Sequence, residues 1–429
     1  MPRSSARSTV LLISTLLAAA PVLRAQAVSP PDPALLARAE KILGRVPVID
    51  GHNDLPSELL DKFGGDPLAA HLEGRQPVLQ TDIPRLRAGH VGAQFWSAYV
   101  ENDSIPVHAS LRQALREIDM ARRMMAAYPD AFEPAYTAAD IEHSEHRHRI
   151  ASLIGVEGGQ AIENSLAALR MLYALGARYM TLTHNTTLAW ADAALDTAAH
   201  HGLTPFGRDV VHEMNRLGMF VDIAHVSADV MRDVLGTTRA PVIFSHSSAF
   251  ALVASPRNVP DDVLGMMKQN GGVVMVNFCP CFTAKGFPEW EARERGVAAA
   301  ARAQGASAAD VRARVQAWEE QNPKPRATVY DIADHVDHLV KVAGVEHVGI
   351  GSDFDGISDT PIGLQDVSAF PNLFAELLRR GYSEDDLKRL AGQNLLRAMK
   401  QMEEVAKQLQ RTEPASLADV RPGAPPASP

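Results

Sequence analysis

Cysteine is scarce in this sequence: only Cys279 and Cys281 occur in 429 residues. A single residue separates the two, and a disulfide over so short a span is expected to be strained. We therefore expect free thiols, in a chain whose size lets it fold without disulfides even in an oxidising compartment. A Cys-Pro-Cys metal site would lack companion cysteines, so the role of the pair stays open.

Clusters of basic residues are also missing. The chain has 42 Lys and Arg against 51 Asp and Glu, a formal net charge of −9, and 46% hydrophobic residues. A mildly acidic chain without a basic patch does not attract phosphate backbones, so we expect no nucleic-acid partner. The remaining composition is that of a globular protein with enough apolar residues for a large core.

Long apolar runs are confined to one place, residues 10–23. Arginines precede this run and Ala-Gln-Ala follows it at residues 25–27, which is typical of a secretory signal peptide. We predict a signal peptide over residues 1–27 and a protein exported to the periplasm or secreted; an uncleaved membrane anchor is the alternative. Residues 411–429, rich in Pro, Ala and Ser, predict a disordered tail. Without a second apolar segment, we expect no stable membrane anchor once the signal is cleaved.

Short apolar runs rich in β-branched residues recur along the rest of the chain. Eight candidate strands cover residues 46–54, 92–100, 151–159, 179–185, 220–227, 241–248, 271–278 and 347–355. Their near-continuous apolar character is typical of parallel strands buried on both faces. Helical spacing fills the intervals, at residues 32–44, 111–128, 165–176, 205–218, 228–235, 260–270 and 328–343.

This alternation of strands and helices predicts a (β/α)8 TIM barrel, as a single domain over residues 28–410. A doubly wound open sheet is the alternative, disfavoured because no Gly-x-Gly-x-x-Gly follows the first strand. The interval between strands 7 and 8 is too long for one helix. We therefore expect a helical insertion there, residues 289–321, that packs over the mouth of the barrel.

In such a barrel the active site forms where the strands end. Six predicted strands end in histidines or carboxylates: His52, Asp54, Glu157, His184, His225, His246 and Asp353. Each alone could be a hydrogen-bonded edge residue, but so many ionisable groups in one cleft would be costly without metal. Imidazoles and carboxylates are good zinc ligands. Two divalent ions, bridged by a carboxylate and a hydroxide, would supply a nucleophile at neutral pH.

Taken as a set, these residues resemble the renal (membrane) dipeptidase family. The matching motifs follow the family's order over nearly the whole predicted domain: DGHND at 50–54, QFWSAY at 94–99, GVEG at 155–158, LTHN at 182–185, HVS at 225–227, SHSS at 245–248, RN at 257–258 and GSDFDG at 351–356. The resemblance implies a dipeptidase with two Zn²⁺ per subunit. It implies that His52 and Asp54 bind one zinc and His225 and His246 the other, with Glu157 bridging both.

The resemblance also implies roles toward a dipeptide substrate. His184 would hold the substrate carbonyl and its developing oxyanion. Arg257 would pair with the C-terminal carboxylate, for which a bidentate guanidinium is suited. Asp353 would carry the proton from the bridging hydroxide to the leaving amine. Asp355 is expected either to support a neighbouring site residue or to form a turn, and Asp50 is expected to have a buried structural role.

Several points remain open at this level. The family often accepts a C-terminal D-residue and often forms homodimers, so both are expectations here. A metal-dependent amidase, lactonase or β-lactam hydrolase on the same barrel is the alternative activity, and an inactive exported binding protein is a further one. The side-chain preference, native metal and physiological substrate, together with the roles of the cysteine pair and the insertion, are not predicted.

Overall fold

The computed structural model describes residues 28–101 and 109–418, and its centre is a closed barrel of parallel strands. The order is β2-β1-β9-β8-β7-β6-β5-β4, and β4 pairs with β2 to close the ring. The predicted TIM barrel is therefore confirmed. Its strands are β1 (Val48–Asn53), β2 (Val91–Tyr99), β4 (Ile150–Glu157), β5 (Ala177–Thr181), β6 (Phe220–Asp222), β7 (Ile243–Phe244), β8 (Val273–Val276) and β9 (Val348–Ile350).

One further strand, β3 (Phe132–Pro134), was not predicted. It pairs in parallel with the first residues of β4, on the edge whose later residues pair with β5. With three residues ending in proline, it carries too little apolar alternation to be recognised from the sequence.

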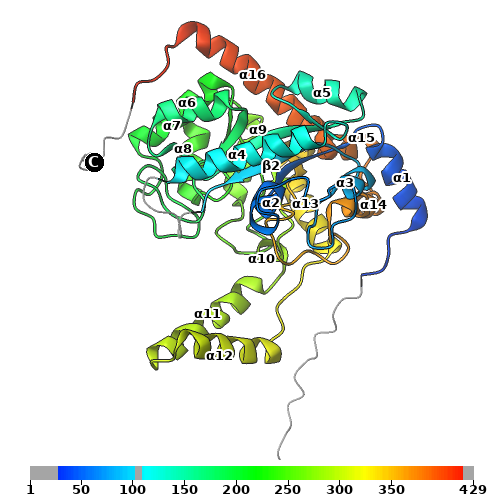
Figure 1. Cartoon of the computed structure of the whole chain (residues 1–429), viewed down its shortest axis with the longest axis vertical. Helices are drawn as coiled ribbons and strands as arrows, with labels where there is room; N and C mark the ends of the chain where they lie inside the picture. Colours follow the sequence, from blue (N-terminus) through cyan, green and yellow to red (C-terminus); the bar gives the residue numbers. More distant parts are fainter. Residues whose placement is uncertain (1–27, 102–108, 419–429) are drawn as a thin grey trace, which may run out of the picture.

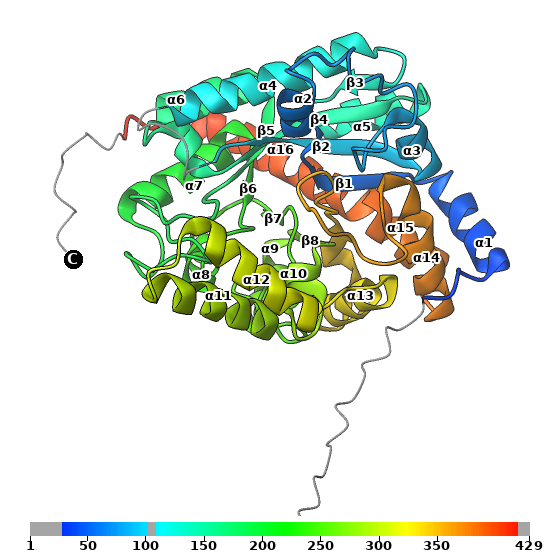
Figure 2. The same cartoon turned by 60° about the horizontal axis from the view of Figure 1, so that its bottom comes forward.

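Helices surround the strands, as Figure 2 shows. The predicted ones are present as α1 (Pro33–Leu43), α4 (Ser110–Ala127), α6 (Leu166–Ala174), α7 (Pro205–Leu217), α8 (Ala228–Thr237), α9 (Asp261–Asn270) and α13 (Val329–Ala343). Their ends follow the expected chemistry: Thr204 caps α7, and Gly218 ends it in a left-handed conformation with φ 83°. The other barrel-side helices are α2 (Leu55–Lys62), α3 (Ile83–Ala88), α5 (Ala138–His146), α14 (Phe370–Arg379) and α15 (Glu384–Lys388).

The N-terminal end of the barrel is filled by apolar side chains and closed by α16 (Asn394–Thr412), which lies behind the strands in Figure 2. Inward-facing strand residues meet buried residues of α16 in one apolar cluster: Ile49, Phe95, Leu153, Tyr179, Phe220, Ile243, Met275, Leu395, Met399 and Met402. Gly155 is needed here because a Cβ at its position would lie 1.9 Å from the ring of Tyr179. The barrel is thus a packed core at this end rather than a pore.

Two helices occupy the predicted insertion between β8 and β9, α11 (Phe287–Ala303) and α12 (Ala308–Gln321). They pack on each other through a small cluster of Ala298, Ala301 and Val311 and through the rings of Trp290 and Trp318. Figure 1 shows the pair standing off the body of the barrel. The expectation that the insertion packs over the mouth is not confirmed.

The expectation of free thiols is wrong, because Cys279 and Cys281 form a disulfide. The short helix α10 (Pro280–Thr283) begins between them, with Pro280 in its first turn. This bend brings the two Cα atoms to 5.2 Å, inside the range that a disulfide requires. Sequence separation alone did not anticipate how a proline-initiated turn places the two side chains.

The predicted signal peptide, residues 1–27, and the last part of the predicted tail, residues 419–429, lie outside the described residues. The first part of that tail is in contact with the domain: α16 runs to Thr412, and Arg170 Nη1 donates to the carbonyl oxygen of Ser416 at 3.0 Å. Among the described residues, no helix combines the length and apolar character needed to cross a bilayer.

Candidate metal centre and active site

All the predicted site residues lie at the C-terminal end of the barrel. His52 and Glu157 belong to the ends of β1 and β4, and the others follow the ends of β1, β5, β6, β7 and β9. Together with Arg257, most of them line one cleft of about 420 Å³: Asp54, Glu157, His184, His225, His246 and Asp353. His52 lies beneath that cleft, fully buried. The structure thus brings together histidines and carboxylates from the ends of six separate strands.

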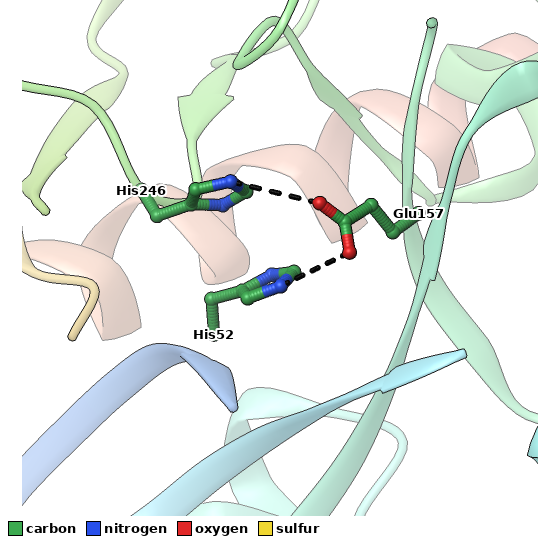
Figure 3. Close-up of side chains that lie close together, drawn as sticks. All are labelled: His52, Glu157 and His246. Atoms are coloured by element: carbon green, nitrogen blue, oxygen red, sulfur yellow. Dashed lines mark ion pairs between the residues drawn. The ribbon is translucent and has the colours of Figure 1, made fainter. Parts of the chain in front are cut away.

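Glu157 is the centre of the cluster, and its two oxygens face opposite halves of it. Oε2 lies 3.2 Å from His52 Nε2, while Oε1 lies 3.1 Å from His225 Nε2 and 3.6 Å from His246 Nε2. Figure 3 shows Glu157 reaching toward the His52 and His246 rings, whose centroids are 4.0 Å apart. His184 Nε2 is more distant from Oε1, at 3.8 Å. One carboxylate can therefore serve two neighbouring cation positions.

His225 and His246 face each other through nitrogens that both carry lone pairs. Asn185 Oδ1 accepts a hydrogen bond from His225 Nδ1 at 3.2 Å, so the ring proton of His225 lies on Nδ1. Ser245 Oγ donates to Asp222 and lies 2.8 Å from His246 Nδ1, which assigns the proton of His246 to Nδ1 as well. The two Nε2 atoms are 2.9 Å apart.

Burial holds the pKa of both His225 and His246 well below the usual range, so both rings are neutral. Two neutral acceptor nitrogens at this separation repel each other unless a cation lies between or beside them. Neutral imidazoles whose Nδ1 protons are anchored by oxygens are the usual form of metal-binding histidine. The residues present therefore fit a metal ion.

His52, on the side of the cluster that faces Glu157 Oε2, also indicates a metal site. Its Nδ1 lies 2.8 Å from Tyr179 Oη, and its buried Nε2 has no hydrogen-bond partner in the described part of the chain. That Nε2 also lies 3.2 Å from Asp54 Oδ2. Burial acts to lower the pKa of His52, yet Tyr179 and Glu157 outweigh it and hold that pKa well above the usual range. The position between the two carboxylates therefore attracts a cation.

Three overlapping groups of ligand atoms lie within 4.8 Å of one another, and each has the composition of a metal site. They are His52 with Glu157 and His246, Glu157 with His184 and His225, and His52 with Asp54 and Asp353. Burial also acts to raise the pKa of Glu157, but His52 and His225 outweigh it and keep that pKa well below its usual range. The carboxylate that touches both halves is thus ionised, as a ligand must be.

Asp353 lies on the same cluster with an unusual backbone. Its φ is 67°, a left-handed conformation that is costly for residues other than glycine and recurs at functional sites. Asn277 Nδ2 donates to Asp353 Oδ2 at 3.0 Å. Burial raises the pKa of Asp353 to about 7. A carboxyl group with that pKa can accept and return a proton near neutral pH.

Among the described residues that line this cleft, Arg257 is the one Lys or Arg. Only 1% of its surface is exposed, and its Nε and Nη1 have no hydrogen-bond partner within the described residues. Its guanidinium carbon lies 4.9 Å from the centre of the Phe282 ring. Burial lowers the pKa of Arg257 to about 10, so it stays charged at neutral pH. A buried cation with free donors is prepared to receive an anion.

The sequence reasoning missed the residues that orient these ligands. Tyr179 reaches His52 from inside the barrel, and Asp222 with Ser245 orients His246. Asp222 also accepts from Thr181 Oγ1 at 2.5 Å. They sit within strands or beside ligands, where an isolated polar residue gives no periodic signal. The one available cue was at Ser245, which immediately precedes His246 in the sequence.

Solved structures with this fold include one probable dipeptidase and two metallopeptidases. The probable dipeptidase PvdM from Pseudomonas aeruginosa is 22% identical, with a TM-score of 0.76 over 87% of this chain and 99% of its own. A metallopeptidase from Rhodobacter sphaeroides, liganded with a phosphinate mimic of the dipeptide L-Ala-D-Ala, is 25% identical, with a TM-score of 0.69 over 83% and 99%. A metallopeptidase called dipeptidase AC is 26% identical, with a TM-score of 0.68 over 83% and 98%.

The family itself is established by the match over residues 36–413 to the membrane dipeptidases, peptidase family M19. That match includes every strand of the barrel and every residue of the cluster around Glu157. The chain therefore belongs to the membrane dipeptidase family and is a metal-dependent dipeptidase.

Proposed function

We propose that this protein hydrolyses dipeptides with two zinc ions per subunit. His52 and Asp54 would hold one ion and His225 and His246 the other, with Glu157 shared. The observation that carries this proposal is the opposite orientation of the two Glu157 oxygens, one toward His52 and one toward His225. Nitrogen and carboxylate ligands in this mixture suit zinc.

When bound, the ions would polarise the scissile carbonyl and lower the pKa of a bridging water, so that hydroxide is available at neutral pH. The protein's own groups supply the remaining functions. Asp353 accepts the proton of the attacking water and delivers it to the amine of the leaving residue. His184, at the edge of the cluster with 15% of its side chain exposed, donates to the carbonyl oxygen as negative charge develops there.

Arg257 would select free dipeptides over longer chains. Its unpaired donors bind the C-terminal carboxylate of the substrate. The cleft has a volume of about 420 Å³, so a substrate that places its scissile bond at the metal cluster and its carboxylate at Arg257 has one residue between them. Burial of the guanidinium strengthens this pairing because little water competes for it. We extend the proposal to dipeptides with a C-terminal D-residue, since the Rhodobacter relative binds a mimic of L-Ala-D-Ala.

We also propose that the protein is exported to the periplasm or secreted after removal of residues 1–27. Mass spectrometry of the protein from whole cells and from the exported fraction tests this through the mass of its N-terminal peptide. An intact N-terminus in the exported fraction would contradict it. Light scattering of the purified protein tests the expected homodimer.

The decisive experiment is a panel of dipeptides with L- and D-residues at the C-terminal position, assayed with the zinc-loaded enzyme. We expect release of free amino acids, lost on chelation and restored by zinc. N-acyl amino acids, lactones and a β-lactam serve as comparison substrates. Faster turnover of these than of every dipeptide, or full activity after exhaustive chelation, would contradict the proposal.

A further inference from the structure

The disulfide-closed turn at residues 277–282, which we call the Cys-Pro-Cys turn, has no role in the function described above. It runs from the end of β8 into α10, and Cys279, Cys281 and Phe282 line the active-site cleft. Asn277 at its start is fully buried. Both cysteines are half-buried. The turn thus forms part of the cleft wall.

At its first residue, the turn is bonded to Asp353. Asn277 Nδ2 donates to Asp353 Oδ2 at 3.0 Å, and Asn277 Oδ1 accepts from the backbone N–H of Cys279 at 2.5 Å. The amide is therefore held at both ends, and its orientation is determined by the backbone of Cys279. This leaves Nδ2 as the group that points to the carboxylate.

At its last residue, the turn contacts Arg257. The Phe282 ring lies under the guanidinium, with 4.9 Å between the ring centre and the guanidinium carbon. Asn258, next to Arg257 in the chain, donates from Nδ2 to the carbonyl oxygen of Phe282 at 2.8 Å. Thr283 Oγ1 also donates to the carbonyl oxygen of Cys279, at 2.7 Å.

The disulfide joins the two halves of this arrangement. It links Cys279, which orients Asn277, to Cys281, which precedes Phe282. Its loop is too short to remove much freedom from the unfolded chain, so it contributes little to stability. Its effect is local: it fixes the path of the backbone between the Asn277–Asp353 hydrogen bond and the contact of Phe282 with Arg257.

We propose that Asn277 is a positioning residue for Asp353, and that the Cys279–Cys281 disulfide holds Asn277 and Phe282 where they align Asp353 and Arg257 with the substrate. The effect on turnover rests on the proposed function, in which Asp353 carries the proton. Misplacement of a reacting group by about 1 Å can cost ~100-fold in rate. The turn is therefore expected to act on kcat through Asp353 and on KM through Arg257.

The first test is substitution of Asn277 in the zinc-loaded, full-length protein. Asn277→Ala is expected to lower kcat ~10- to 100-fold with KM changed less than about threefold. Asn277→Asp keeps the shape and the bond from Cys279 but has no N–H to offer Asp353, so it is expected not to restore kcat. Recovery of kcat by Asn277→Asp would mean that Asn277 only shapes the turn, and would overturn the proposal.

The matched control lies at the other end of the same strand. Asn270 precedes β8, accepts from Val242 N at 2.9 Å, donates to Ala240 O at 3.1 Å and is not among the described residues that line the cleft. Asn270→Ala is expected to lower the melting temperature and leave kcat and KM unchanged. Equal losses of kcat in both Asn-to-Ala variants would overturn the proposal.

The second test is the double substitution Cys279→Ser and Cys281→Ser. It is expected to lower kcat/KM ~10-fold while the melting temperature and zinc content stay as in the wild type. Alkylation followed by mass spectrometry should first find no free thiol in the wild type. Free thiols there, or full kcat/KM in the double variant, would overturn the part of the proposal that concerns the disulfide.

A crystal structure of Asn277→Ala separates this inference from the proposed function. We expect the Asp353 carboxylate to leave its wild-type position, whether or not dipeptides are hydrolysed. An unmoved carboxylate would overturn the positioning role. A displaced carboxylate, in a protein whose wild type hydrolyses no dipeptide, would instead refute the proposed function alone.

Discussion

The two ends of the barrel are built from the same strands and differ in what fills them. At the N-terminal end, Tyr179, Phe220 and Met275 pack against Met399 of α16 in an apolar cluster. At the C-terminal end, the same strands carry histidines and carboxylates that surround Glu157. One end is stabilised by burial of apolar surface. The other places charged and polar groups out of water, which is costly unless they have partners.

Tyr179 shows how the two ends are joined. Its ring packs on Phe95 in the apolar cluster, with 5.1 Å between ring centroids, while its hydroxyl reaches His52 at 2.8 Å. The apolar end thus supplies a rigid floor on which the ligands are oriented. We expect substitutions at the N-terminal end, which α16 closes, to change the stability of the fold without changing catalysis. Substitutions at the C-terminal end, which opens into the cleft, should change catalysis without changing stability.

The largest effect is expected from Glu157→Gln. An amide cannot supply the charge that both halves of the cluster share, so zinc content should fall and dipeptide turnover should drop ~1,000-fold or more, with the circular dichroism spectrum unchanged. The matched control is Glu213→Gln, because Glu213 is equally buried but pairs with Arg170 and Arg216 away from the cleft. Wild-type zinc content in Glu157→Gln would contradict a shared carboxylate.

At the closed end, Met399→Ala should destabilise the fold and spare catalysis. Met399 is fully buried between α16 and the strands, and truncation of such a side chain costs about 2–5 kcal/mol. Urea denaturation measures the loss, and kcat/KM should be unchanged. Met171, which is 59% exposed, provides the control: Met171→Ala should change neither quantity. A large loss of kcat/KM in Met399→Ala would show that the two ends are not separable.

Arg257→Ala is expected to affect substrates selectively. It removes the buried partner of the C-terminal carboxylate, so kcat/KM should fall ~10- to 100-fold for dipeptides with a free carboxylate. For amidated dipeptides, which lack that charge, the fall in kcat/KM should be much smaller. Steady-state kinetics with both substrate forms gives the comparison. Equal losses on both would contradict the carboxylate-binding role.

The smallest effect concerns His335 of α13, whose Nδ1 accepts from the backbone N–H of Ala249 at 3.0 Å. Burial lowers the pKa of His335 from 6.5 to about 4. Below pH 6.5 the unfolded chain therefore binds this proton and the folded chain does not, so stability falls as the pH decreases toward 4. From pH 7.5 to 5.5, His335 should contribute a loss of about 1 kcal/mol in the free energy of unfolding.

Urea denaturation at these two pH values, with and without His335→Gln, measures this contribution. The variant should show a smaller loss of stability on acidification than the wild type. The control is the exposed His71, whose positive φ of 47° Asn also tolerates. In His71→Asn the loss of unfolding free energy on acidification should equal that of the wild type. An unchanged pH dependence in His335→Gln would contradict the assignment.

The sequence predicted the barrel because its strands are apolar runs separated by helices with clear periodicity. It overestimated the length of some strands. In the run at 241–248 only Ile243–Phe244 is strand, because the chain bends after Phe244 and carries His246 to the cleft. The three-residue β3 had too little pattern to be predicted. The disulfide was missed because contact between Cys279 and Cys281 depends on the bend at Pro280.

The cluster residues could be predicted because each lies at the end of a strand or soon after it, and parallel strands of a barrel end at one mouth. What the sequence could not give is the set of contacts made across the barrel. Tyr179 lies 127 residues from the histidine that it contacts, and Asn277 lies 76 residues from Asp353. Such pairs depend on the register and closure of the barrel, which no local pattern encodes.

Anomalous diffraction at the zinc absorption edge, from crystals of the zinc-loaded protein, tests the central claim most directly. The arrangement of ligands predicts two peaks, one beside each oxygen of Glu157, with His52 and Asp54 around one and His225 and His246 around the other. A single peak, or peaks outside this cluster, would contradict a two-metal centre built on Glu157.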